Sequence, residues 1–265
     1  MAGVKRKSED MDPAPNGGAR ASPYMPMFET FRAELDEHHD RRERINKASR
    51  DVTGLSKKII FNLQRTREIG QPTHVSITKV IDPMYASIKK ILESFVPDLE
   101  GINAHRYHYN ISPGIQEFME AYLFHAYLQT QRIPTHPEAA AALPEGIRLT
   151  QEDYLLGLFD TTGEMMRWCI TYMATNGKLP GGGQGGMGVL ADMQAIRGFL
   201  EGMDVKGSRD LKSFDNKLTV TRQSVEKVEN GVYSMLVRGK ERPKGWRPDA
   251  AADGRRDGPE EVESY

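Results

Sequence analysis

The hydrophobic positions of this chain recur at steps of three and four residues, the spacing that places side chains on one face of an α-helix. The first such run starts near Phe28, passes through Leu35, Ile45 and Val52, and reaches Leu63. A helix of about forty residues would be roughly 60 Å long, which is more than a small isolated domain needs. The pattern therefore predicts a long helix that belongs to a bundle or to the wall of an assembly.

Further helical segments follow, separated by sequences that contain glycine and proline. We expect them over residues 76–96, 101–132, 150–176, 187–203 and from 208 or 210 to about 238. Ser112-Pro113 resembles a cap followed by a first-turn proline, which predicts that the helix restarts or bends there. Residues 133–149 are expected to form a loop with room for one helical turn. No segment has the alternation of a β-strand, so the predicted fold class is all-α, an elongated bundle of about six to seven helices.

The two ends of the chain depart from this pattern. Residues 1–24 are rich in Pro, Gly, Ser and charged side chains, a composition typical of disorder, and the charged end of the chain is similar. The sequence thus predicts a disordered tail over 1–24, an all-helical domain over 25–240 and a second disordered tail over 241–265. Lys5-Arg6-Lys7 is compatible with a nuclear address and equally with a short basic patch on a tail.

Two pairs of acidic residues lie on predicted helices. Asp160 and Glu164 are four residues apart and share a helix face, while Glu117 and Glu120 are three apart and flank a buried seam. If the two helices pack together, the four carboxylates would form a cluster of the oxygen ligands that hard divalent cations prefer. Acidic pairs are also common on solvated helix faces, and from spacing alone that remains the simpler interpretation.

Composition narrows the possible functions. The net charge of -1 indicates no general affinity for nucleic acid, so a basic surface must be local or supplied by a partner. The single cysteine, Cys169, excludes an internal disulfide and a cysteine-based zinc site. No apolar run approaches the roughly 18 residues of a membrane span, so we expect no membrane association. Neither acidic pair is part of the Glu-x-x-His repeat of a di-iron bundle.

Phosphodiester cleavage remains compatible with these residues. Two Mg²⁺ ions held by carboxylates can activate water and stabilise a leaving oxygen. The segment His105-Arg106-Tyr107-His108-Tyr109 mixes cationic and aromatic side chains on the helix that carries Glu117 and Glu120. Such a mixture suits contact with the backbone and bases of a single strand, although an ordinary polar helix face would look the same.

Five sequence blocks, in order, resemble one known family. They are Ser49-Arg-Asp-Val-Thr, Gly114-Ile-Gln-Glu-Phe-Met-Glu-Ala, Asp153-Tyr-Leu-Leu-Gly, Asp160-Thr-Thr-Gly-Glu-Met-Met-Arg and Lys227-Val-Glu-Asn-Gly-Val-Tyr. In these blocks the sequence resembles the translin family, and within it the subunits of the translin-associated factor X (TRAX) type. The resemblance covers most of the chain, from about Phe28 to Lys244.

The resemblance implies an all-helical subunit of a hollow hetero-octamer with a translin homologue. In that family the complex is a Mg²⁺-dependent endoribonuclease for single-stranded RNA, which removes passenger strands in RNA silencing and processes transfer-RNA fragments. Catalysis and binding of Mg²⁺ or Mn²⁺ would then fall on Glu117, Glu120, Asp160 and Glu164, and nucleic-acid contact on Arg106 and His108. Single-stranded DNA is a second candidate ligand, and nucleus and cytoplasm are the expected locations. The alternative is a non-catalytic, nucleic-acid-binding scaffold that stabilises translin.

Overall fold

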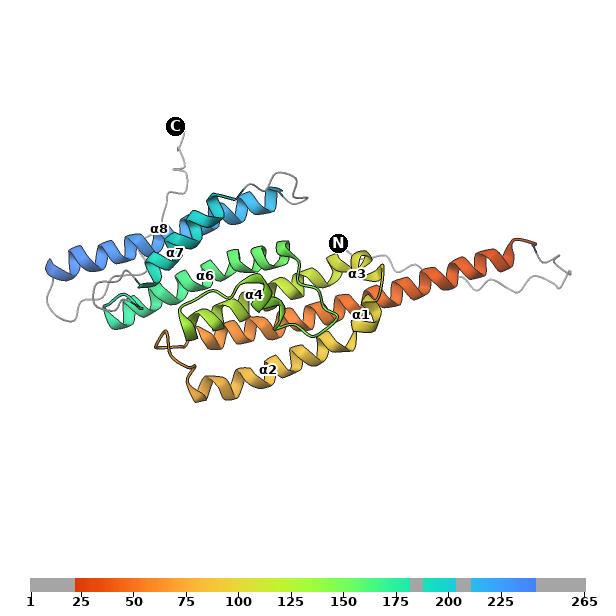
Figure 1. The fold of residues 1–265 in the computed structure, drawn as a ribbon, viewed down its shortest axis with the longest axis horizontal. Coiled ribbons are helices and arrows are strands. Elements are labelled where there is room, and N and C mark those ends of the chain that lie inside the picture. The colour runs from red at the N-terminus through yellow and green to blue at the C-terminus, as the bar shows by residue number, and fades with distance from the viewer. Residues whose placement is uncertain (1–21, 182–187, 204–210, 242–265) are drawn as a thin grey trace, which may run out of the picture. The chain divides into compact units, whose positions relative to one another are not determined.

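The computed structural model describes residues 22–181, 188–203 and 211–241, and within these ranges every regular element is a helix (Figure 1). The elements are α1 (Met25–Leu63), α2 (Val75–Ser94), the 3₁₀ helix η1 (Val96–Leu99), α3 (Asn103–Arg106), α4 (His108–Thr130), α5 (His136–Ala140), α6 (Gln151–Asn176), α7 (Gly188–Glu201) and α8 (Leu211–Glu241). Six of these helices are long, as the hydrophobic pattern predicted, and the all-α fold class is confirmed. The predicted tails, with Lys5-Arg6-Lys7, fall almost wholly outside the described residues. No helix in the described ranges is long and apolar enough to cross a membrane.

The chain divides into two compact units, with the boundary inside α1, between Arg41 and Arg42. In the first unit, the described residues form the first half of that helix. Its apolar side chains Phe28, Phe31 and Leu35 are 60%, 50% and 68% exposed. They belong to the apolar stripe that the sequence predicts, but the buried part of the stripe begins only at Ile45. Periodicity identifies a helix face, whereas a packing partner decides whether that face is buried.

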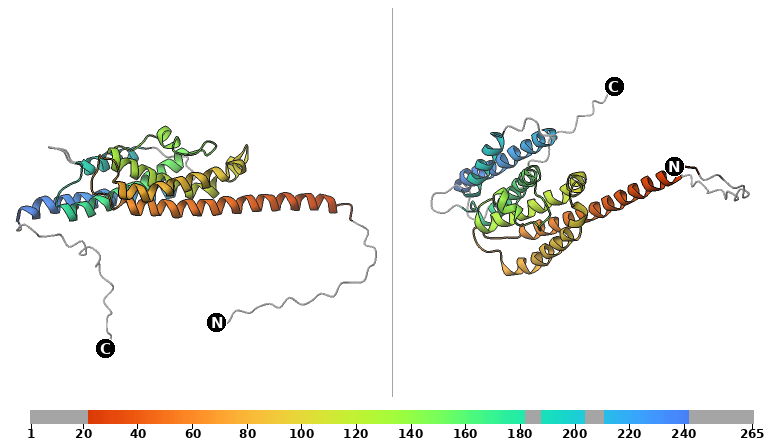
Figure 2. Two further views of the ribbon diagram at one scale, coloured as in Figure 1. Left: turned by 90° about the horizontal axis from the view of Figure 1, so that it is seen from below. Right: turned by 45° about the vertical axis from the view of Figure 1, so that its right-hand side comes forward.

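The core of the second unit is built around α6, which packs against α4 and α8 (Figures 1 and 2). Helix α7 packs mainly on α8. Ile45, Val52, Ile59 and Leu63 of α1 are fully buried in this unit, and Trp168 is the largest buried side chain of α6. The acidic pairs named above lie on the two central helices, α4 and α6.

Local sequence chemistry accounts for both ends of α6. The Thr150 hydroxyl accepts a hydrogen bond from the Asp153 amide at 3.1 Å and so caps the first turn. Gly177 ends the helix in the left-handed conformation, with φ of 63°, where glycine has no steric penalty. Both ends were predicted.

The helix does not restart at Ser112-Pro113, which was one of the two outcomes expected there. Helix α4 is continuous through Pro113, and the discontinuity lies earlier, at Tyr107 between α3 and α4. Two features explain the difference. Ile111 and Ile115 anchor the helix in the core on both sides of the proline, and the Ser112 hydroxyl bonds to Asp153 of α6. Tertiary packing thus compensates for the backbone hydrogen bond that proline cannot donate.

Candidate functional site

The two acidic pairs lie next to a close contact between α4 and α6. A Cβ atom added at Gly157 of α6 would lie 2.7 Å from the Met119 Cβ and 3.0 Å from the Gln116 carbonyl oxygen of α4. Only glycine permits this approach. One turn later, the Thr161 hydroxyl lies 3.5 Å from the Glu120 carbonyl oxygen. The close contact between the helices brings Glu120 near the acidic pair of α6.

The four acids are more enclosed than a solvated helix face would be. Glu164 is buried, with 8% of its surface exposed, and the Glu117 side chain is 19% exposed. The Asp160 side chain is 40% exposed, and Glu120 is partly buried. The burial of Glu164 was not expected, because its neighbours in the helical pattern are mixed. The interpretation of these acids as an ordinary surface face therefore loses support.

The acids also influence one another electrostatically. Burial, followed by the charges of Asp160, Glu117 and Glu164, raises the pKa of Glu120 to about 8. Burial raises the pKa of Glu117 as well, with contributions from Asp160 and Glu164 and an opposing one from Lys57. The other three carboxylates thus act on Glu120. From the sequence, this was expected only if the two helices packed together.

Cationic side chains stand beside three of the four acids. Lys217 of α8 donates to Oδ1 of Asp160. The Nζ atom of Lys57, on α1, is 3.7 Å from Oε2 of Glu117.

Glu164 has two neighbours. Nη1 of Arg167 is 3.4 Å from its Oε1, and Gln64, in the turn after α1, donates to its Oε2 at 2.6 Å. The carboxyl group of Glu120, in contrast, has no hydrogen-bond or ion-pair partner among the described residues. It is the acid whose ionised form has the fewest compensating contacts.

Four carboxylates from two packed helices are the donors that Mg²⁺ and Mn²⁺ prefer, and the uncompensated Glu120 favours a cation. As the side chains stand, however, no three His, Cys, Asp or Glu residues in the described ranges are grouped closely enough to hold a metal ion. The residues thus fit a hard divalent cation in donor type and in charge. Binding would require the protein's own cations to release the acids that they now neutralise.

His108, a candidate for nucleic-acid contact, faces into the protein. Its Nε2 atom lies 3.3 Å from Oδ2 of Asp153, whose side chain is only 1% exposed. Asp153 also accepts hydrogen bonds from Ser112 at 2.5 Å, from Gln116 at 3.0 Å and from Thr150 at 2.7 Å. This network was missed at the sequence level. The sequence pattern that could have pointed to this network is an acid, Asp153, three residues after the capping Thr150. That pattern indicates the start of a helix but does not indicate a contact with α4.

The other candidate, Arg106, is the last residue of α3 and is exposed. Tyr109 is 66% exposed, and its ring lies 6.0 Å from that of His108 in an edge-to-face arrangement. An arginine and an aromatic ring at the surface are the side chains that bind nucleic-acid backbone and bases. The segment therefore keeps this potential at Arg106 and Tyr109 more than at His108.

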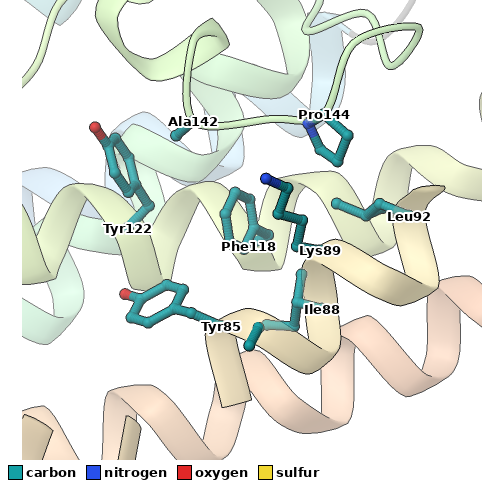
Figure 3. A pocket seen from close by; sticks show the side chains of 9 residues that line it. Tyr85, Ile88, Lys89, Leu92, Phe118, Tyr122, Ala142 and Pro144 are labelled. Carbon is teal, nitrogen blue, oxygen red and sulfur yellow. The ribbon is translucent and has the colours of Figure 1, made fainter. Parts of the chain in front are cut away.

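Two pockets lie apart from the acids. One, of about 260 Å³, is bounded by α2, α4 and the loop after α5, and its lining includes Tyr85, Phe118, Tyr122, Lys89 and Pro144 (Figure 3). The other, of about 450 Å³, lies between α4, α6 and α7 and contains Asp192, which accepts hydrogen bonds from Tyr127 and Gln131. None of the four carboxylates lines either pocket.

Comparison with known proteins gives consistent matches over most of the chain. The model of the translin family matches residues 40–239. Translin-associated protein X of Mus musculus is 31% identical over 249 residues, covering 84% of this chain and 82% of that protein. The translin-associated protein X homolog of Schizosaccharomyces pombe (strain 972 / ATCC 24843) is 30% identical over 220 residues, covering 80% and 87%.

Solved structures show the same fold. Apo-NeC3PO matches with a TM-score of 0.58 at 18% identity, and the match covers 79% of this chain and 97% of the NeC3PO chain. AfC3PO in a complex with duplex RNA matches with a TM-score of 0.57 at 18% identity, and the match covers 82% of this chain and 100% of the AfC3PO chain. At this identity the likeness concerns the fold alone. The family match and the relatives at 30% identity decide the assignment: the chain belongs to the translin family.

Proposed function

We propose that this chain is the catalytic subunit of a Mg²⁺-dependent endoribonuclease that cleaves single-stranded RNA together with a translin homologue. The observation that supports this proposal most is the crowding of three other carboxylates around Glu120 at the contact of α4 and α6. Its relatives are named for their association with translin, and one protein of the same fold was solved with duplex RNA. These names support a translin partner and RNA as the ligand.

Glu117, Glu120, Asp160 and Glu164 would hold the metal in this proposal. Bound Mg²⁺ or Mn²⁺ would supply an activated water and stabilise charge at the scissile phosphate. The chain itself orients the carboxylates: the contact at Gly157 fixes α4 against α6, and Gln64 holds Glu164 by a hydrogen bond. Arg106 and Tyr109 would contact the RNA backbone and a base.

Exposed apolar side chains support assembly with a partner. In the first unit these are Phe28, Phe31 and Leu35 of α1; in the second, Tyr233 and Leu236 of α8 are 67% and 58% exposed. Large apolar groups at a surface commonly mark a protein interface. We propose a closed hetero-octamer that encloses the RNA, present in nucleus and cytoplasm and acting in RNA silencing and transfer-RNA processing.

The decisive experiment uses the chain purified as a complex with its translin homologue. Labelled single-stranded RNA is incubated with Mg²⁺, with Mn²⁺ and with excess EDTA, and a blunt duplex serves as the control substrate. We expect cleavage of the single strand with either metal and none in EDTA. Full cleavage in EDTA would exclude the metal mechanism.

An intact complex that binds RNA but never cleaves it would favour the alternative, a non-catalytic scaffold. A specific observation makes that alternative worth testing. Lys217, Lys57 and Arg167 already stand against three of the four acids, an arrangement that would also suit a purely structural charge cluster.

A further inference from the structure

Lys217 differs from the other cations around the carboxylate cluster. It lies on α8, and its ammonium group donates to Oδ1 of Asp160 on α6. Its side chain is only 26% exposed. Lys57 and Arg167, which stand beside Glu117 and Glu164, are 65% and 67% exposed. Solvent and salt screen an exposed pair strongly and a partly buried pair much less. Lys217 is therefore the least exposed of the three cations that stand beside the carboxylate cluster, and its charge is the least screened by solvent.

The influence of Lys217 extends beyond its direct partner. Its charge also acts on Glu120, where it opposes the combined effect of the three neighbouring acids. It thus stabilises both the acid that it contacts and the acid that has no partner among the described residues. A divalent cation bound by the same carboxylates would have the same electrostatic effect, with twice the charge.

We propose that Lys217 is an internal counter-ion that competes with the divalent metal for Asp160 and so sets the metal concentration at which the site fills. This inference rests on the proposed function, since it takes the four acids as the metal site. An oxygen of Asp160 that accepts from an ammonium group is less available to a metal, and the two positive charges repel at short range. A lysine suits this role because its compact charge sits on a flexible stem that can move away.

The test measures binding of Mn²⁺ alone to the complex of the full chain with its translin homologue, by calorimetry, without RNA. Lys217→Met keeps the length and the apolar stem of the side chain and removes the charge. We expect the variant to bind Mn²⁺ roughly tenfold more tightly, a coupling of ordinary size between two ligands. Without metal it should melt at a lower temperature than the parent, and Mn²⁺ should raise its melting temperature by more.

Lys227→Met is the matched control. Lys227 lies on the same helix and is exposed, and it has no ion-pair partner among the described residues. Its substitution changes the net charge equally, so it should alter the Mn²⁺ dissociation constant by less than about twofold. Lys217→Arg retains the competing charge and should bind Mn²⁺ no more tightly than the parent. Lys217→Gln is a second neutral variant if the complex with Lys217→Met does not assemble.

The outcomes separate the two proposals. If the parent and both neutral variants bind Mn²⁺ equally, or the neutral variants bind it more weakly, the competition is overturned while the metal site stands. If neither the parent nor any variant binds Mn²⁺, the proposed metal site is overturned and the role of Lys217 with it. Binding by the neutral variants but not by the parent would support the competition in its strongest form.

Discussion

Helices α4 and α6 carry one carboxylate that is well supplied with hydrogen bonds and, further along, a group of four carboxylates that crowd one another. Near the start of both helices, Asp153 is buried and accepts hydrogen bonds from Ser112, Gln116 and Thr150, with His108 beside it. Further along, the carboxyl group of Glu120 has three acids for neighbours and no hydrogen-bond partner among the described residues. The hydrogen bonds of Asp153 link the two helices through neutral donors, whereas the four crowded acids concentrate negative charge.

This difference indicates different roles. A buried carboxylate with enough donors stabilises the fold, because each donor left without an acceptor would be penalised. A crowded group of acids destabilises the metal-free fold, and such groups occur mainly where a cation or a reaction requires them. We therefore expect substitutions at Asp153 to affect stability and substitutions around Glu120 to affect chemistry.

The largest expected effect is a loss of RNA cleavage when an acid of the crowded group is replaced. Glu120→Gln or Asp160→Asn should reduce the rate of RNA cleavage at least about a hundredfold, because each removes a metal ligand. Two carboxylates about 6 Å apart repel by roughly 3 kcal/mol at an effective dielectric constant of about 20, and less where water screens them. The variants should therefore be as stable as the parent in EDTA, or slightly more so.

Cleavage rates in Mg²⁺ and melting curves in EDTA, both on the assembled complex, check this expectation. Glu152→Gln is the control, since Glu152 is an exposed acid in the first turn of α6. It should cleave at the parental rate. A complex with Asp160→Asn that also cleaves at that rate would remove Asp160 from the site.

Asp153 should give the opposite result. Asp153→Ala leaves three buried or partly buried donors without their acceptor, which should lower the free energy of unfolding by about 2–4 kcal/mol. The complex that still assembles should cleave RNA at close to the parental rate. Melting temperature and the cleavage rate per assembled complex measure the two effects. An unchanged melting temperature with lost cleavage would show that Asp153 belongs to the chemistry after all.

Much of the fold follows from the sequence alone. A period of three to four residues identified the six long helices, and Thr150 and Gly177 marked the ends of α6 through local chemistry. Two features could not be derived from the pattern of the sequence. Phe28 lies on the apolar stripe but is exposed, and α4 does not restart at Pro113. In both cases the outcome depends on which elements pack against the helix, and hydrophobic periodicity carries no information about them.

The candidate site was predictable in part. The spacing of the acids and the family resemblance identified all four carboxylates, because each pair is local in sequence. Their surroundings were not predictable. Lys217 lies 57 residues from Asp160 in the chain and reaches it only because α8 packs on α6. The contact at Gly157 likewise becomes visible only when the facing helix is known.

The crowding also predicts how stability depends on pH. The pKa of Glu120 is raised to about 8 in the folded chain from its ordinary 4.5, so the folded state binds a proton more tightly than the unfolded state does. The stability due to this proton is complete below about pH 4.5 and is lost as the pH rises through about 8. In EDTA, the melting temperature of the parent should therefore fall between pH 5.5 and 8.5 by more than that of Glu120→Gln. Equal slopes would show that Glu120 is not crowded in solution.

The smallest expected effects concern RNA binding next to the Asp153 group. The ring of His108 faces Asp153 and is only 25% exposed, so His108→Gln should weaken RNA binding by less than about threefold. Arg106 is exposed, and Arg106→Ala should remove one phosphate contact, weakening binding several-fold and reducing the salt dependence by about 0.7 in log–log slope. Fluorescence anisotropy of labelled single-stranded RNA at several KCl concentrations, with Asp160→Asn also present to prevent cleavage, measures both effects. If His108→Gln weakens binding and lowers the slope as much as Arg106→Ala does, His108 must leave Asp153 to contact RNA, and the division between a structural and a chemical carboxylate group would no longer hold.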